Sequence, residues 1–286
     1  MRIELSVLLL ALSVCVHAQI VTQEDWTFYC NGQSAAVLTY NGSDSEVFIP
    51  DYVTTSQGQF AVTKVGDDLS HPFQGNTLLS SVKFPETVTS IDVEAFDGCS
   101  FLKQVSLSRN LVEIASYAFY RCASLDTIAL PRPLSYIGMM AFGGCKAMRS
   151  IRLREEVTTL QGYTFEGTPL TTLYVDAPRP PVCAYDLVKT GKDDFYGQCT
   201  LVVPIGCGEA YRNAPVWERF SHVIEVPLRG DINADGSCDV TDVNILVNRL
   251  LRKDENDYGQ RDDINADHVI DVSDINELIN ILLGRE

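Results

Sequence analysis

The pattern of apolar and polar positions repeats through the middle of the chain. Leu79, Leu102, Leu125 and Met148 lie 23 residues apart, and Leu170 follows after 22. Each of them begins a similar phrase, in the order LSSVKF, LKQVSL, LDTIAL, MRSIRL and LTTLYV. Self-similarity at a fixed period in the twenties is typical of a solenoid, in which neighbouring coils stack and share one core.

The spacing inside each phrase predicts a strand. Apolar residues occupy positions one, four and six, as Leu102, Val105 and Leu107 do in the second phrase. This leucine-rich repeat spacing predicts one short strand per coil and a mainly β solenoid with a parallel sheet. The side chains between them face outward by the two-residue period, and this face is either solvated or a platform for a protein or glycan. The outward columns are Ser81, Gln104, Thr127, Ser150 and Thr172, and Lys83, Ser106, Ala129, Arg152 and Tyr174.

A second apolar phrase follows about ten residues later in each coil and ends in a phenylalanine. We predict that these rings form a buried column: Phe96, Phe119, Phe142 and Phe165.

Cysteine recurs just after each of these phenylalanines. Cys99, Cys122 and Cys145 share one position in successive coils, and Thr168 occupies it in the fourth. A small side chain repeated in every coil predicts a ladder of buried free thiols, not a metal site. Outside this ladder, the sequence leaves open whether a disulfide joins two of three further cysteines, which are Cys183, Cys199 and Cys207.

The repeats resemble those of the BspA-like leucine-rich repeat family of bacterial surface proteins. The motifs that carry the resemblance are L-x-x-V-x-L and V-x-x-I-x-x-x-A-F-x-x-C, and residues 47–50 and 60–66 resemble the usual first coil. The resemblance covers about Ala35 to Val226. It implies an exported adhesion or recognition surface that has no known catalytic residues.

Less regular segments flank the repeats of residues 79–176. Short strand-like runs separated by turn residues predict that residues 19–78 are an N-terminal cap with degenerate first coils. Prolines end the regular coils because they cannot take part in a central strand. Residues 177–228, with Trp217 and Phe220 as large apolar plugs, are predicted to be the C-terminal cap.

Residues 1–18 are predicted to be a signal peptide. Arg2 precedes an apolar run at residues 5–16 that is too short to span a bilayer, and Ala18 suits a cleavage site. Lipoprotein processing at Cys15 is the alternative, and Val14 is larger than that signal usually has before the cysteine. With no transmembrane segment later in the sequence, we expect a secreted or cell-surface protein.

The overall charge and the absence of several catalytic motifs reduce the number of possible functions. The 286-residue chain has a formal net charge of −16 and no cluster of lysine or arginine, which excludes nucleic acid as a partner. The sequence has no G-x-S-x-G, no H-E-x-x-H and no phosphate loop. We therefore predict that it is not an enzyme.

Residues 229–286 contain a duplicated calcium-loop motif. The segments 231–251 and 263–283 are identical at 13 of 21 positions. Oxygen ligands at loop positions 1, 3, 5, 7, 9 and 12 form the spacing that calcium requires, position 7 through its backbone carbonyl. The predicted ligands are Asp231, Asn233, Asp235, Ser237, Asp239 and Asp242 in the first loop, and Asp263, Asn265, Asp267, Val269, Asp271 and Asp274 in the second.

Each loop leads into an amphipathic helix, whereas no such helix precedes it, so each unit is half of an EF-hand. The pair resembles a type I dockerin domain, a small all-α module. This resemblance implies two Ca²⁺ sites and docking to a cohesin-like or other scaffold protein. The partner contacts that it implies are Val240, Thr241, Val247, Asn248, Val272, Ser273, Ile279 and Asn280.

Two features of the tail qualify this interpretation. His268 stands where the loop glycine makes a sharp turn, which predicts a weaker second calcium site. Dockerins commonly accompany polysaccharide-degrading enzymes, so one alternative is a component of such an assembly. The other alternative is that the calcium module only caps the solenoid.

Overall fold

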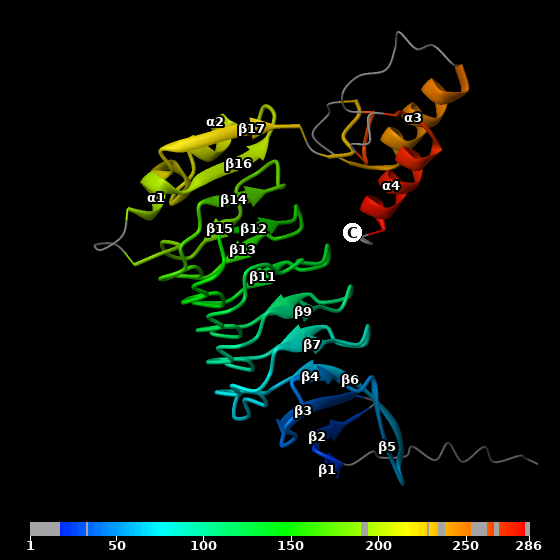
Figure 1. Cartoon of the computed structure of the whole chain (residues 1–286), viewed down its shortest axis with the longest axis vertical. Coiled ribbons are helices and arrows are strands. Elements are labelled where there is room, and N and C mark those ends of the chain that lie inside the picture. Colours follow the sequence, from blue (N-terminus) through cyan, green and yellow to red (C-terminus); the bar gives the residue numbers. More distant parts are fainter. Residues whose placement is uncertain are drawn as a thin grey trace, which may run out of the picture.

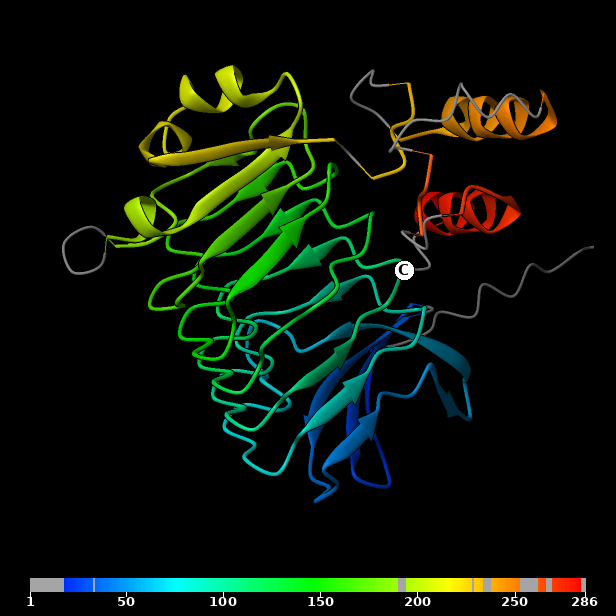
Figure 2. The same cartoon turned by 45° about the horizontal axis from the view of Figure 1, so that its top comes forward.

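The computed structural model describes residues 18–32, 34–189, 194–227, 229–233, 238–252, 262–265 and 269–283. Its short strands stack into a curved solenoid, and the two helices of the tail lie beside the solenoid (Figures 1 and 2). The predicted mainly β solenoid with a small helical tail is confirmed. Of the predicted signal peptide, residues 1–17 lie outside the described residues.

The regular coils differ from the prediction of one strand per coil, because the second apolar phrase also forms a strand that pairs along the stack. These second strands form part of a ten-stranded sheet, in which each isoleucine or leucine is buried between its equivalents. The strands are β8 (Ser90–Ile91), β10 (Glu113–Ile114), β11 (Tyr136–Ile137), β13 (Thr159–Leu160) and β15 (Val182–Cys183).

The N-terminal segment extends the same sheet. Three strands pair antiparallel, and a hairpin then turns the chain into the parallel stack. Trp26 and Phe28 are buried there, and the Trp26 ring lies 6.0 Å from the Phe73 ring at the start of the solenoid core. The strands are β1 (Gln19–Gln23), β2 (Trp26–Asn31), β3 (Ser34–Tyr40), β5 (Tyr52–Thr55) and β6 (Gly58–Val65).

The strands of the first phrase form two separate sheets. A three-stranded sheet contains β4 (Glu46–Phe48), β7 (Ser81–Lys83) and β9 (Gln104–Ser106). A four-stranded sheet contains β12 (Ser150–Leu153), β14 (Thr172–Val175), β16 (Thr200–Pro204) and β17 (His222–Val226).

Neither sheet includes the LDTIAL phrase, so the strand prediction for this phrase is wrong. Residues 126–131 form no strand, and no backbone hydrogen bond joins them to β9 or β12. In the coil at 170–175, by contrast, the N–H of Thr171 bonds to the carbonyl of Arg149. Proline lacks an N–H and restricts the residue before it. Pro131 has a counterpart in Pro85, which leaves β7 intact, so Pro133 is the proline that distinguishes this coil.

The C-terminal cap closes the last coil with aromatic side chains. Tyr211 and Trp217 are fully buried, and each donates a hydrogen bond to a carbonyl, Tyr211 to Ala177 (2.7 Å) and Trp217 to Pro181 (2.8 Å). Phe220 is buried beside them. Besides β16 and β17, the cap contains α1 (Phe195–Gln198), α2 (Gly208–Arg212) and the 3-10 turn Trp217–Arg219.

The phenylalanine column stands at the centre of the stack, and Phe73 extends it by one ring. The rings are fully buried and nearly parallel, which allows offset stacking along the solenoid axis. The centroid distances are 4.8 Å for Phe73–Phe96, 5.3 Å for Phe96–Phe119, 5.7 Å for Phe119–Phe142 and 6.3 Å for Phe142–Phe165.

The predicted thiol ladder is also present. Each cysteine Sγ donates to the carbonyl of the phenylalanine of the coil before it, at 3.0 Å for Cys99, 3.2 Å for Cys122 and 3.3 Å for Cys145. Thr168 donates the equivalent bond with its hydroxyl, at 2.5 Å. Burial raises the pKa of Cys99 and Cys145 to about 12, so these thiols are unreactive at neutral pH.

Among the described residues every cysteine is free. This includes the three for which the sequence left a disulfide open: Cys183, Cys199 and Cys207.

Gly138 provides a sharp test of how closely the coils approach. A Cβ at this position would lie 2.3 Å from the backbone N of Ser116 and 2.5 Å from the backbone C of Ala115. Backbone atoms cannot give way, so Gly138→Ala is expected to destabilise the protein by about 2–3 kcal/mol. The control is Gly143→Ala, whose Cβ would lie 3.0 Å from the Tyr120 side chain and 3.3 Å from the nearest backbone atom, the carbonyl O of Glu166. Equal denaturant midpoints for the two variants would contradict this.

Candidate functional site

The tail folds around a small core of its own. Helices α3 (Val240–Arg252) and α4 (Val272–Leu282) pack together, as their duplicated apolar pattern predicts. The first isoleucine of each loop is buried against these helices. The core side chains are Ile232, Leu246, Ile264, Leu278 and Ile281, and they form a cluster separate from that of the solenoid.

The carboxylate at loop position 12 organises each loop. Asp242 is fully buried and accepts backbone N–H groups from Ile232 (2.8 Å), Asn233 (3.2 Å) and Asp239 (2.9 Å). Three hydrogen bonds to one carboxylate fix the backbone on both sides of the turn.

The second loop repeats this arrangement at the same positions. Asp274 is fully buried and accepts from Ile264 (2.7 Å), Asn265 (3.2 Å) and Asp271 (2.8 Å). The described parts of the two loops therefore have the same local geometry.

The carboxylate at loop position 9 caps the helix that follows. Asp239 accepts the N–H of Thr241 and Asp271 accepts that of Ser273, both at 2.6 Å. Hydrogen bonds from the side chain and backbone of the same residues lower the pKa of both carboxyl groups, because they stabilise the charged form. Both carboxylates are therefore charged at neutral pH.

The described residues fit a hard cation. Asp231 is almost fully buried in the same loop as Asp242, and every candidate side-chain donor in the two loops is an oxygen. Calcium prefers such ligands. Within the described part of the chain, no group of three or more acidic, histidine or cysteine side chains forms a metal site. The remaining predicted ligands, Asp235, Ser237 and Asp267, lie outside that part.

The second calcium site is predicted to be the weaker one. His268 would need the left-handed backbone of the loop turn, which costs a non-glycine residue roughly 1–2 kcal/mol, or about fivefold to thirtyfold in affinity. His268→Gly is expected to bring the second dissociation constant close to the first in a calorimetric calcium titration. Gly236→His should weaken the first site in the same way, and two equal sites in the unmodified chain would contradict the prediction.

The eight residues predicted to contact a partner are all at least partly exposed. Val240 is 67% exposed and Val272 is 64% exposed, both at the first turn of their helix, while Ile279 is 38% exposed further along α4. Asn248 is exposed on α3. Thr241, Val247, Ser273 and Asn280 are exposed or half-buried. Their role in binding stays a prediction.

Two ion pairs of the tail were not predicted from the sequence. Arg229 donates to the carbonyl of Ile264 (3.0 Å) and to Glu277 (2.6 Å), so it ties the start of the tail to the second loop and α4. Arg249 on α3 pairs with the buried Asp262 at 2.5 Å. The only signal was the Asp262–Asp263 doublet, which has no counterpart before the first loop.

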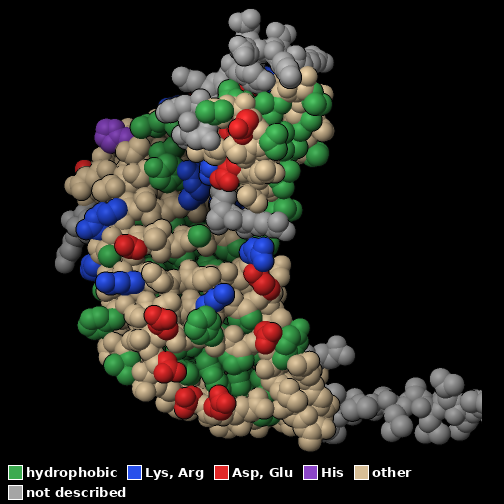
Figure 3. Space-filling view, turned by 45° about the vertical axis from the view of Figure 1, so that its right-hand side comes forward, with side chains coloured by type: hydrophobic (Ala, Val, Ile, Leu, Met, Phe, Trp, Pro, Cys, Tyr) green, Lys and Arg blue, Asp and Glu red, His purple; other side chains and the backbone are tan. Residues whose placement is uncertain are grey.

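The outward face of the solenoid is mostly polar, as predicted. All ten side chains of the two outward columns are exposed or half-buried. Acidic and basic side chains are mixed over the middle of this side of the molecule, and acidic and apolar side chains gather towards its N-terminal end (Figure 3). Phe48 on β4 is 68% exposed.

The comparisons with known families agree with both parts of the structure. The BspA type leucine rich repeat region matches residues 70–178 in six copies, and the dockerin type I domain matches residues 229–283. Both resemblances given by the motifs are confirmed. No curated protein is significantly similar to the chain. None of the helices in the described part of the chain has the length and apolar character that crossing a bilayer requires.

Several solved leucine-rich repeat structures are similar. The leucine-rich repeat protein from T. pallidum is 19% identical with a TM-score of 0.50, and the match covers 82% of this chain and 95% of that one. A leucine-rich repeat protein from Bacteroides ovatus is 24% identical (TM-score 0.47), covering 54% of this chain and 46% of that one. A leucine rich cell surface protein from Faecalibacterium prausnitzii is 23% identical (TM-score 0.45), covering 74% and 55%. At these identities the likeness shows the fold alone, and the chain spans about half the length of the last two.

Proposed function

Because the chain carries BspA-type leucine-rich repeats and a dockerin type I domain, we propose that it is an exported binding protein held in a larger assembly. The solenoid recognises a protein or glycan, and the tail docks in a calcium-dependent way to a cohesin-like module of a scaffold. The observation that carries the proposal is the duplicated loop geometry around Asp242 and Asp274. It positions two equivalent helices whose first turns are exposed.

Neither module supplies catalytic chemistry of its own. Dockerin domains bind calcium and cohesins, and the two families whose models match the chain are both non-catalytic module types. The protein would thus contribute recognition to its assembly, and the identity of its scaffold would indicate whether that assembly degrades polysaccharides.

Capture of a cohesin module tests the docking. We expect the immobilised full chain to retain type I cohesin modules in calcium and to release them in chelator, because the helices depend on the loops. A double variant, Val240→Asp with Val272→Asp, should weaken capture by at least about tenfold by placing charge in an apolar contact. The matched control is Val112→Asp, on an exposed valine of the solenoid. Calcium binding with no cohesin capture would favour the structural-cap alternative.

Export is tested on the mature protein. The proposal predicts a chain that begins at Gln19 and is recovered from the medium or the cell surface. A lipid-modified Cys15 at the N-terminus would support the lipoprotein alternative, and an uncleaved Met1 on an internal protein would contradict export.

A further inference from the structure

The turns that follow the second strand of each coil form a continuous edge of the solenoid. In each turn a backbone N–H donates to a carbonyl of the next turn. These bonds run from Tyr117 to Met139 (2.8 Å), from Met140 to Gly162 (3.2 Å) and from Tyr163 to Asp186 (2.7 Å). The turns are therefore held in register, and equivalent positions lie above one another along the solenoid axis.

One position of this edge carries large side chains on a left-handed backbone. The φ angle is 60° at Tyr117, 51° at Met140 and 61° at Tyr163, and Glu94 (55°) occupies the same position in the coil before them. This conformation costs a non-glycine residue roughly 1–2 kcal/mol, whereas glycine adopts it freely. Large side chains that are kept at such positions are candidates for function.

Tyr185 places a second ring beside Tyr163. Tyr185 is 61% exposed, and the planes of the two rings lie within 17° of parallel with their centroids 6.4 Å apart. Rings in face-to-face contact are only about 3.5–4 Å apart, so neither of these rings covers the face of the other. Gly162 makes room for them, because a Cβ there would lie 2.8 Å from the Cβ of Tyr185.

The polar groups of this edge suit an uncharged ligand. Within the described residues, the hydroxyls of Tyr163 and Tyr185 make no hydrogen bond to protein, so both can donate to a ligand and accept from it. The nearby arginines already have partners in the chain. Their ion pairs are Asp186–Arg219 (2.5 Å) and Asp97–Arg121 (2.9 Å). An anionic ligand would gain no pairing from cations that are already satisfied.

We propose that this edge, which we call the tyrosine edge (Tyr117, Met140, Tyr163 and Tyr185), binds a neutral glycan chain. The C–H groups on the face of a sugar ring pack against the negative face of an aromatic ring. Successive coils are about 4.8 Å apart because their strands pair, which is close to the length of one sugar residue in an extended chain. Consecutive sugars therefore meet consecutive coils, and the tyrosine hydroxyls bond to sugar hydroxyls. The inference rests on the proposed recognition role of the solenoid and chooses the glycan from its two ligand classes.

The size of the tyrosine edge favours a glycan over a protein. Tyr185 is well exposed and the other three side chains are half-buried, so together they offer on the order of 300 Å² of surface. A stable protein interface takes about 800 Å² from each partner around a well-packed apolar centre. A narrow line of small platforms suits a linear chain of sugars better.

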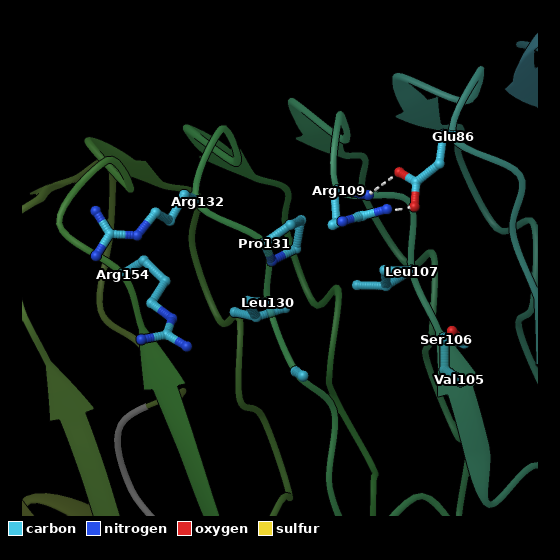
Figure 4. A pocket seen from close by; sticks show the side chains of 10 residues that line it. Glu86, Val105, Ser106, Leu107, Arg109, Leu130, Pro131, Arg132 and Arg154 are labelled. Carbon is cyan, nitrogen blue, oxygen red and sulfur yellow. Dashed lines mark hydrogen bonds and ion pairs between the residues drawn. The ribbon is translucent and has the colours of Figure 1, made fainter. Parts of the chain in front are cut away.

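The outward face of the solenoid has an opening as well, but its charges do not select a ligand. Where the strand at residues 126–131 is missing, a crevice of about 420 Å³ lies over an aliphatic floor that includes Val105 and Leu107, which are only half-buried (Figure 4). The arginines that border the crevice already pair with carboxylates of the chain. The pairs are Arg109–Glu86, Arg132–Glu155 and Arg154–Asp176.

Calorimetric titration of the full chain with neutral hexasaccharides tests the proposal. The probes are cellohexaose, xylohexaose, mannohexaose and maltohexaose, and we expect at least one to bind with an affinity that changes little as salt is raised. Tyr185→Ala should weaken this binding about fivefold or more, and Tyr163→Ala combined with Tyr185→Ala about thirtyfold or more. Tyr185→Phe keeps the ring and should cost only about twofold to threefold.

Controls separate this proposal from the docking function. Tyr52→Ala removes a ring that is 44% exposed on β5 and should leave glycan affinity unchanged. All variants should still capture cohesin, since their changes lie outside the tail, so a failure of glycan binding alone leaves the docking function standing. Binding of none of the four probes, or binding that Tyr185→Ala leaves intact, would overturn the proposal. Binding of polygalacturonate in place of the neutral probes would also overturn it.

Discussion

Phe119→Ala is expected to lower the free energy of unfolding by about 3–5 kcal/mol. The ring is fully buried and lies between Phe96 and Phe142, at centroid distances of 5.3 and 5.7 Å. Removing it deletes apolar contact with two coils at once and leaves a cavity in the middle of the column. Neighbouring coils are tied by backbone hydrogen bonds on both sides, so they cannot collapse to fill this cavity.

The measurement is urea denaturation of the full chain, with the solenoid transition followed by circular dichroism. Phe101→Ala is the matched control, because the same atoms are removed from a ring that is 60% exposed in the same coil. Its free energy of unfolding should fall by less than about 0.5 kcal/mol. If Phe119→Ala lowers the free energy of unfolding no more than Phe101→Ala does, the phenylalanine column does not stabilise the stack.

Asp242→Ala is expected to unfold the first loop and its helix while the solenoid stays folded. The substitution leaves three backbone N–H groups without their acceptor, which costs about 3 kcal/mol or more. Among the described residues of the tail, five apolar side chains are buried in its core, and a core of this size gives little stability in reserve. The same change removes a predicted calcium ligand, so calcium should no longer restore the fold by mass action.

Calorimetry with and without calcium checks this result. In the unmodified chain, the melting temperature of the tail should rise with calcium, and that of the solenoid should not. In Asp242→Ala the melting temperature of the tail should fall, or its transition should vanish. Asn244→Ala, on the exposed face of α3, should leave this melting temperature unchanged. A tail that melts at the same temperature in all three proteins would refute the role of Asp242.

The two loop–helix units of the tail and the phenylalanine column could be predicted because their causes are local or periodic. A loop ligand set is defined by residue spacing within 12 positions, so the sequence contains all of it. The phenylalanines recur with the coil, and stacking identical coils brings identical positions together. The thiol ladder of Cys99, Cys122 and Cys145 followed from the same periodicity.

The pairing of strands depended on neighbours that the sequence pattern does not specify. LDTIAL has the same apolar spacing as LKQVSL, yet only the latter forms a strand, because ladder hydrogen bonds require correctly placed groups in the adjoining coils. The ion pairs of Arg229 and Arg249 likewise join residues 48 and 13 positions away.

The sequence by itself thus determined the solenoid, its core columns and the two loop–helix units of the tail, because repetition and short-range spacing are enough to define them. Only the tertiary structure decided where the sheet opens and which side chains meet there. Arg109, Arg132 and Arg154 belong to three different coils, and the stacking of those coils brings them around one crevice. A break in one strand then exposes the apolar floor, and although Pro133 distinguishes the coil where it occurs, the repeated apolar spacing does not reveal it.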